Sequence, residues 1–537
     1  MAEKKQNYLH GASILAAGVV IMKILGAVYK LPLVRIIGVE ANGYFNVAYI
    51  IYQVMLTVST AGLPVALSRM ISEATTLGRD AQAKKIFNVS MTTFIIVGSI
   101  FSALMFLFPT ELAILMKRPE AAQSIRVLSP SLLLVCIASA YRGYIQGHSN
   151  MIPTTISQVI EVLAKVIVGL AAAWLLVRAG RSDPITASGA VIGVDVGSFA
   201  ALVCLFFYYK RDYSGKTVIS NEKTDSTGTI LKNLMKIGIP ITLGASVMSV
   251  ISMIDTSLVN MQLEANAAVL TETPSLLWGT YSALFPLYNL PSAFITPLTI
   301  SVVPAIVSHM TNKQHREAGL VASSSLRITS IIALPMGVGL AVVSEPIIRL
   351  LLPTVTSETG PLLLTILGVA SFFVCISLVS NAVLQASGHE KYPIISMVIA
   401  GFVKVGVNLV LVGNPQINIY GAPIGSIFCF AVICVLNWFF MRKCMPVRPR
   451  FADTMLKPII SSAVMGGGAW AVYGLASKLL ASGGELSKFS MLFALVAAVG
   501  TGVIIYLVMI ITTKAITIDD MKLIPGGEKV AKLLKIR

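Results

Sequence analysis

Five basic side chains stand inside or at the end of long apolar segments of the sequence. They are Lys23, Lys30 and Arg35 in segment 9–36, Lys165 in segment 154–177 and Lys404 in segment 393–413. An ammonium group that faces lipid costs about 2.5–3.5 kcal/mol on insertion scales, so a cation at membrane depth is expected to face a water-filled cavity, a carboxylate or a bound ligand. The five cations therefore predict that an anion is bound within the membrane. None of the five is predicted to be a catalytic residue.

The spacing of the first three cations predicts a basic stripe. Lys23 and Lys30 are seven residues apart, which is two helical turns, so both face the same direction. Pro32 is expected to bend or end the helix and to leave Arg35 near the outer rim of the membrane. Lys30 has a second interpretation, since a lysine near a helix end can extend its ammonium group to the interface.

Three acidic residues of the apolar segments are candidate partners of the cations or of a coupling ion. Glu161 stands one turn before Lys165 and can pair with it directly in a structural ion pair. Asp195 either neutralises Lys165 or Lys404 or carries a coupling ion, and Asp255 lies near the outer end of its segment. Lys404 has no acidic residue in its own helix, so its partner is expected on another helix or on a ligand.

The elements that position these residues are predicted to be membrane helices. Of the 537 residues 55% are hydrophobic and 12% are charged, whereas soluble proteins average about 25% charged residues. This composition excludes a soluble globular protein. Fourteen apolar segments of membrane-spanning length follow one another. They cover residues 9–36, 44–68, 86–108, 124–145, 154–177, 186–208, 233–260, 277–306, 321–343, 361–386, 393–413, 419–441, 457–480 and 489–513.

The net charge of +17 is assigned to loops and not to nucleic-acid binding. Basic residues are concentrated in alternate loops, and the positive-inside rule therefore predicts that both termini are cytoplasmic. The densest groups are Arg69, Arg79, Lys84 and Lys85, then Lys210, Arg211, Lys216 and Lys223, and finally Arg442, Lys443, Arg448 and Arg450. No loop is long enough for a soluble catalytic domain, and six scattered cysteines predict neither disulfides nor a metal site. An enzyme is therefore not expected.

Sequence matches predict an internal duplication. Residues 64–70 match residues 304–310, and three further pairs of short matches follow in the same order at similar offsets. The fold class expected is an all-α polytopic membrane protein of about 14 helices, with two parallel six-helix lobes and two C-terminal helices. The expected parts are lobe 1–210, linker 211–232, lobe 233–441, loop 442–456, helices 457–513 and a basic tail 514–537.

Several short segments resemble the polysaccharide-lipid exporters of the multidrug/oligosaccharidyl-lipid/polysaccharide superfamily, in the branch of stage V sporulation protein B and the MurJ-type lipid II flippases. They are Lys23-Ile-Leu-Gly26, Arg35-Ile-Ile-Gly38, Ala61-Gly-Leu-Pro-Val-Ala-Leu-Ser68, Arg142-Gly-Tyr-Ile-Gln-Gly147, Ser157-Gln-Val-Ile-Glu161 and Leu290-Pro-Ser292. Lys23 and Arg35 stand at basic positions of the family's first helix, while a third such position falls on Tyr29, with Lys30 next to it.

The resemblance implies a cationic central cavity and the export of a polyprenyl-diphosphate-linked glycan, with lipid II of peptidoglycan synthesis expected, across the bacterial cytoplasmic membrane. The expected partners are this anionic lipid, the bilayer and cell-wall synthesis proteins, and no nucleic acid. No cofactor is expected, and a coupling ion or the membrane potential would supply the driving force. Two alternatives stay open at this point: a cation-coupled multidrug exporter of the same superfamily, and a membrane glycosyltransferase.

Overall fold

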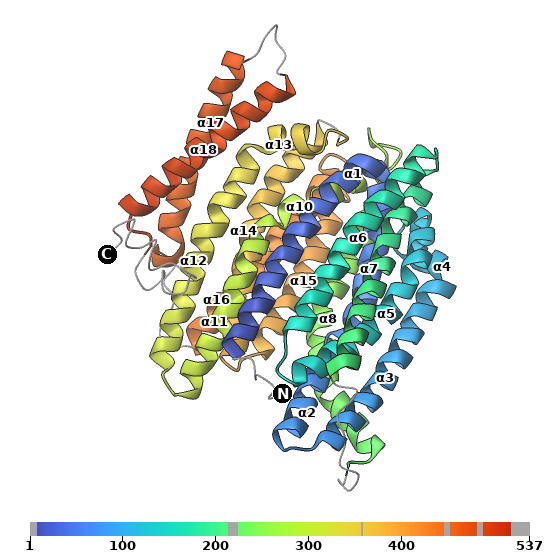
Figure 1. The fold of residues 1–537 in the computed structure, drawn as a ribbon. Helices are drawn as coiled ribbons and strands as arrows, with labels where there is room; N and C mark the ends of the chain where they lie inside the picture. The colour runs from blue at the N-terminus through green and yellow to red at the C-terminus, as the bar shows by residue number, and fades with distance from the viewer. Residues whose placement is uncertain (1–7, 213–223, 356–357, 445–451, 481–486, 517–537) are drawn as a thin grey trace. The chain divides into compact units, whose positions relative to one another are not determined.

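The computed structural model describes residues 8–212, 224–355, 358–444, 452–480 and 487–516, and these form helices joined by short turns (Figure 1). The chain divides into two compact units, Met1–Glu264 and Ala265–Arg537, and each is described by itself. Thirteen helices among the described residues are long and apolar enough to cross a membrane. The predicted all-α polytopic fold is therefore confirmed.

The first two predicted helices form one long kinked element, and the first of the thirteen candidate spans covers Tyr29–Thr76 of the described residues. Helix α1 (Tyr8–Thr60) continues through Pro32 and changes direction at Gly38, where φ is 81° and ψ is 176°. The prediction that Pro32 could end the helix is therefore wrong. Glycine lacks a Cβ atom and adopts this backbone conformation without strain, which is why the kink lies at Gly38.

Two predicted helices are divided in the structure, because new helices begin inside them with a proline in the first turn. Residues 64–68 do not end the second helix, because α1 stops at Thr60 and α2 (Leu63–Thr76) begins anew. The predicted helix 277–306 is three helices, namely α9 (Pro274–Ala283), α10 (Phe285–Tyr288) and α11 (Leu290–Thr311). Each of the four new helices has a proline in its first two positions. Proline has no N–H group, and the first turn is where that loss costs nothing.

The other spans agree with their predicted bounds to within six residues. They are α3 (Asp80–Leu107), α5 (Ala122–Gly147), α6 (Ile152–Arg178), α7 (Asp183–Asp212), α8 (Thr227–Ala265), α12 (His315–Val342), α14 (Thr359–Ala386), α15 (Lys391–Leu411), α16 (Gly421–Cys444), α17 (Lys457–Leu480) and α18 (Lys488–Thr512). Short helices α4 (Pro109–Leu115) and α13 (Ser344–Leu351) follow α3 and α12, and brief η1 (Pro119–Ala121), η2 (Asn418–Tyr420) and η3 (Ala452–Leu456) complete the list.

The two units repeat one packing order. In the first unit α2 contacts α3 and α5, α5 contacts α3 and α7, and α6 lies beside α7 (Figure 1). In the second unit α11 contacts α12 and α14, α14 contacts α12 and α16, and α15 lies beside α16. This correspondence supports the duplication found in the sequence. The compact division falls at residue 264, so that α8 belongs to the first unit, although the repeat places it at the start of the second lobe.

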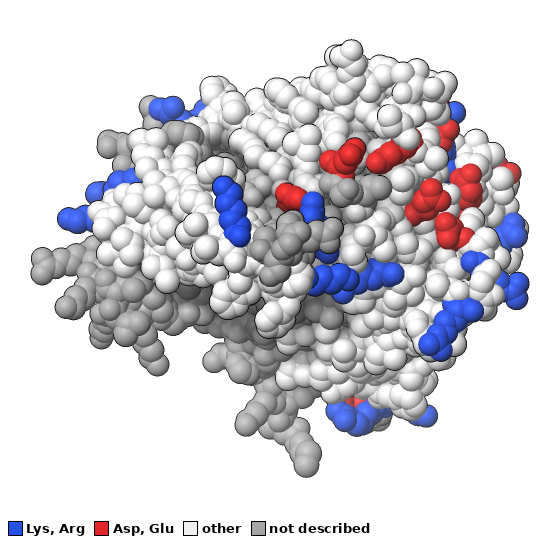
Figure 2. All heavy atoms as spheres, turned by 90° about the horizontal axis from the view of Figure 1, so that it is seen from above, with Lys and Arg blue, Asp and Glu red and all other residues white. Residues whose placement is uncertain are grey.

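The outer surfaces of many helices are apolar. Phe402, Leu479 and Phe489 are each at least three-quarters exposed. On the face shown in Figure 2, uncharged residues make up most of the surface between the charged groups. Single exposed apolar residues are ordinary in a soluble protein, but such long apolar faces require lipid. The chain is a multi-pass membrane protein.

Candidate anion-binding site

Lys165 lies against tyrosine rings of the first helix. Its Nζ atom is 4.7 Å from the centroid of the Tyr49 ring, 5.5 Å from that of Tyr29 and 3.5 Å from the Tyr49 hydroxyl. Lys165 belongs to α6, while both tyrosines belong to α1, one before and one after the Gly38 kink. A cation over an aromatic face gains about 0.5–2 kcal/mol. The ammonium group is therefore oriented by neutral partners.

Lys30 lies in a second neutral environment next to this one. Its Nζ donates hydrogen bonds to Oδ1 of Asn46 at 2.9 Å and to Oδ1 of Asn42 at 3.3 Å, and it lies 4.0 Å from the centroid of the Phe45 ring. Asn42 and Asn46 are buried. The interpretation that Lys30 extends to the membrane interface is therefore wrong in this structure, since its ammonium group contacts buried side chains.

Two stacked rings join the two lysines. Phe45 and Tyr49 are one turn apart on α1, their centroids are 5.8 Å apart and their planes differ by 10°. Lys30 covers the first ring and Lys165 the second. Among the described residues, neither lysine has a carboxylate within ion-pair distance. The two ammonium groups repel one another, so an anion close to both would relieve that repulsion.

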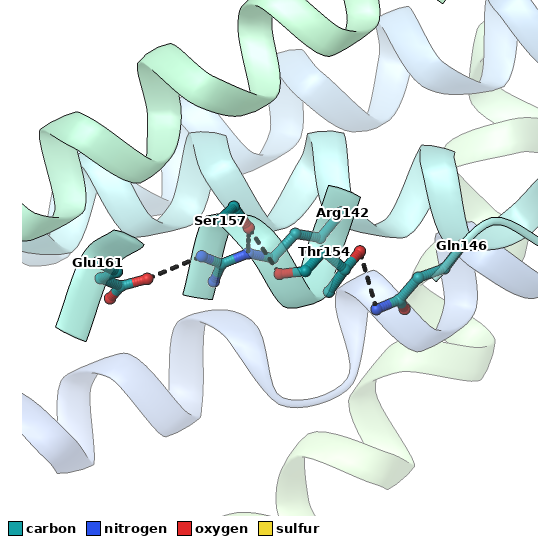
Figure 3. Close-up of polar contacts among 5 residues, drawn as sticks. All are labelled: Arg142, Gln146, Thr154, Ser157 and Glu161. Carbon is teal, nitrogen blue, oxygen red and sulfur yellow. Dashed lines mark hydrogen bonds and ion pairs between the residues drawn. The ribbon is translucent and has the colours of Figure 1, made fainter. Parts of the chain in front are cut away.

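Glu161 pairs with Arg142 and not with Lys165. Arg142 Nη2 lies 2.7 Å from Glu161 Oε2, and Arg142 Nε donates to Ser157 Oγ at 3.3 Å (Figure 3). The structural ion pair between Glu161 and Lys165, one of the two interpretations of the sequence, is therefore wrong. The planar guanidinium group reaches across from α5 and bonds to two residues one turn apart on α6, which a lysine on the same helix cannot match. The sequence had indicated Arg142 only as part of a motif.

Asp195 accepts hydrogen bonds from Ser131 of α5. The Ser131 N–H donates to Asp195 Oδ1 at 3.1 Å, and the Ser131 hydroxyl donates to the same oxygen. Ser131 follows Pro130, which interrupts the hydrogen-bond ladder of α5 and turns the next N–H outward. Among the described residues no ion pair joins Asp195 to Lys165, while pairing with Lys404, which belongs to the other unit, stays a prediction. The role of Asp195 with a coupling ion stays a prediction.

The remaining predicted residues lie on three different helices. Lys23 belongs to α1, and its side chain lies outside the described part of the chain. Arg35 is exposed on α1, and Asp255 is buried on α8. Lys404 is half-buried on α15 of the second unit. Within the described residues no group of three or more His, Cys, Asp or Glu side chains has the arrangement that could hold a metal ion.

Comparison with known proteins identifies the family. The family described as polysaccharide biosynthesis protein matches residues 8–310, which is more than half of the chain. The chain belongs to the polysaccharide biosynthesis protein family. This finding confirms the resemblance noted from the sequence motifs.

Three relatives from Bacillus subtilis (strain 168) match most of this polysaccharide biosynthesis protein. Uncharacterized membrane protein YabM is 26% identical and covers 99% of this chain and 98% of its own. Lipid II flippase MurJ is 24% identical over 88% of both chains. Stage V sporulation protein B is 26% identical over 86% of this chain and 90% of its own. The relatives thus include a lipid II flippase and a sporulation protein, the two kinds of protein named in the branch that the motifs indicated.

Two solved structures share the fold of this family member. Lipid II flippase MurJ in an inward closed conformation superposes with a TM-score of 0.67 at 16% identity, over 93% of this chain and 98% of that one. An inward-facing multidrug resistance MATE family transporter of the MOP superfamily superposes with a TM-score of 0.62 at 15% identity, over 80% of this chain and 93% of that one. These likenesses show a MurJ- and MATE-like fold.

Proposed function

We propose that the protein is a flippase that moves a polyprenyl-diphosphate-linked glycan precursor from the inner to the outer leaflet of the cytoplasmic membrane, with lipid II as the first candidate. The observation that carries the proposal is the Lys30 and Lys165 pair, whose ammonium groups contact rings and amides instead of carboxylates. Two cations at membrane depth that have no carboxylate within ion-pair distance in the described part of the chain are costly unless a ligand compensates them. A diphosphate group has the charge to do so.

The neighbouring side chains suit the rest of such a head group. The amides of Asn42 and Asn46 and the hydroxyl of Tyr49 can exchange hydrogen bonds with sugar hydroxyls or phosphate oxygens. The prenyl tail needs no polar partner and can remain in the bilayer. Lysine binds phosphate as a point charge and tolerates changes of ligand orientation, which a transported substrate undergoes.

The transport step in this proposal is alternating access. Transporters built from repeats commonly move one repeat against the other around a site at membrane depth. No covalent chemistry is needed, so the protein acts as a transporter and not as an enzyme. Cytoplasmic termini, a coupling ion or the membrane potential as driving force, and cell-wall synthesis proteins as partners belong to the same proposal.

A cation-coupled multidrug exporter is the second candidate. It is favoured by Asp195, which accepts hydrogen bonds from Ser131, since a carboxylate at membrane depth can carry a proton or cation. The two candidates differ in substrate charge. Loss of a lysine would abolish export of an anionic lipid but would not impair binding of a cationic drug.

The test is complementation of bacteria depleted of their lipid II flippase, followed by an assay of precursor exposed at the outer face. We expect the wild-type chain to restore exposure and Lys165→Gln to fail while accumulating normally in the membrane. Lys478→Gln, which removes an exposed lysine near the end of α17, is the matched control and should remain active. Normal exposure with Lys165→Gln would overturn the site. A wild-type chain that restores nothing would overturn lipid II as substrate.

A further inference from the structure

The position of Glu161 creates a conflict within the proposed site. Glu161 precedes Lys165 by four residues on α6, and a glutamate one turn before a lysine is the favourable order for an ion pair within a helix. Such a pair would neutralise the cation that the proposed function requires. In the structure Lys165 contacts Tyr49 and Tyr29 instead. Something must therefore hold the Glu161 carboxylate.

Arg142 holds it through two contacts. Its Nη2 lies 2.7 Å from Glu161 Oε2, and its Nε donates to Ser157 Oγ at 3.3 Å (Figure 3). The Ser157 hydroxyl donates in turn to the Thr154 carbonyl at 2.8 Å, and Ser157 is fully buried. The exposed fraction is 12% for the Arg142 side chain and 26% for that of Glu161. The guanidinium group is therefore held in place and shielded from water, which strengthens the ion pair.

We propose that Arg142 is a positioning residue that sequesters Glu161 and thereby keeps Lys165 available for the diphosphate. The α5 and α6 hairpin contains Arg142, Glu161 and Lys165 in this cluster, two positive charges and one negative charge. With Arg142 present, the unpaired positive charge is at Lys165. Without Arg142, Glu161 turns to Lys165 and the cluster has no unpaired cation. This inference rests on the proposed function.

The test measures affinity of the purified full-length protein in detergent for farnesyl diphosphate, with farnesol as the probe that lacks the diphosphate. Arg142→Gln should weaken farnesyl diphosphate binding by roughly tenfold or more, the size expected when a charged hydrogen bond is lost. Glu161→Gln should keep the wild-type affinity or exceed it. The double variant Arg142→Gln/Glu161→Gln should recover most of the affinity, because no carboxylate is left to neutralise Lys165. Farnesol binding should not change in any variant.

A purely structural ion pair would give another pattern. It predicts that Arg142→Gln and Glu161→Gln impair binding alike, and that result would overturn the proposal, as would a double variant as weak as Arg142→Gln. Gln146→Met is the matched control, because it removes the 3.5 Å hydrogen bond to Thr154 from the same hairpin without changing charge. It should leave the affinity unchanged, and a tenfold loss there would overturn the electrostatic explanation.

A milder variant covers the case in which Arg142→Gln does not accumulate. Ser157→Ala removes the hydroxyl that Arg142 Nε contacts and leaves both charges in place. It should weaken farnesyl diphosphate binding a few-fold, and added Glu161→Gln should reverse the loss. Unchanged affinity in Ser157→Ala would count against the proposal. Lys165→Gln distinguishes a failure of the proposed function from a failure of this inference. If Lys165→Gln binds farnesyl diphosphate like the wild type, the site given for the proposed function is wrong. If Lys165→Gln loses binding but the Arg142 variants bind normally, only this inference is refuted.

Discussion

The Lys30 ammonium group lies 2.9 Å from Asn46 Oδ1, although sixteen residues separate the two along one helix. In a straight α-helix that separation would be about 24 Å along the axis, far beyond the reach of a lysine side chain. The contact exists because α1 changes direction at Gly38. A single backbone conformation thus joins the two halves of α1 around the paired lysines.

Replacement of Gly38 should therefore disturb both stability and the site. Gly38→Ala places a Cβ atom in open space, but φ of 81° is strained for any residue with a Cβ. We expect a loss of about 1–3 kcal/mol in stability, seen as a lower melting temperature in detergent, together with weaker farnesyl diphosphate binding. Gly26→Ala, also in open space but without positive φ, should not lower the melting temperature, because alanine is the better helix former. An unaffected Gly38→Ala would contradict the role given to the kink.

The Tyr49 ring should matter more than its hydroxyl. Tyr49→Phe removes only the hydroxyl at 3.5 Å from Lys165 and keeps the ring at 4.7 Å. Its affinity for farnesyl diphosphate should stay close to that of the wild type. Tyr49→Leu removes the aromatic face, worth about 1 kcal/mol, and should weaken binding about fivefold because Lys165 is no longer oriented. Equal effects of the two changes, measured by titration of the purified variants, would refute this account.

The close approach of two helices at Gly62 should tolerate no side chain. A Cβ atom at Gly62 would lie 2.0 Å from the Gly238 carbonyl oxygen of α8, and the Gly62 N–H bonds to Thr242 Oγ1 at 3.1 Å. Gly62→Ala must push the backbones apart, which costs about 1–3 kcal/mol or more. Gly228→Ala, at a position of α8 with open space around it, is the control. The check is thermal unfolding, and equal melting temperatures would contradict the packing described.

The distribution of basic residues predicts the orientation of the chain. A reporter fused after Asn221 or at the C-terminus should be cytoplasmic, and one inserted between Glu264 and Thr273 should be external. The measurement is activity of a reporter that works on one side of the membrane only. Reversed labelling would refute the orientation and the direction of export proposed above.

The sequence by itself determined where the chain crosses the membrane. Transfer of about twenty apolar residues into lipid is a local property, so the bounds of α5, α6 and α17 could be predicted to within a few residues. The cations Lys30 and Lys165 were also evident, since a charge in an apolar segment stands out without any knowledge of its neighbours. The motifs gave the family by the same kind of local comparison.

Only the tertiary structure decided which charges meet. Glu161 has a favourable partner four residues away in Lys165, yet it pairs with Arg142, nineteen residues away on α5. Asp195 is engaged by Ser131, which α5 presents only because Pro130 interrupts its ladder. Spacing along one helix gives the possible pairs within that helix, whereas pairs between helices depend on packing and on kinks such as that at Gly38. Packing and kinks are set by contacts between distant segments. The free-energy differences between competing ion-pair partners are too small to be derived from local sequence.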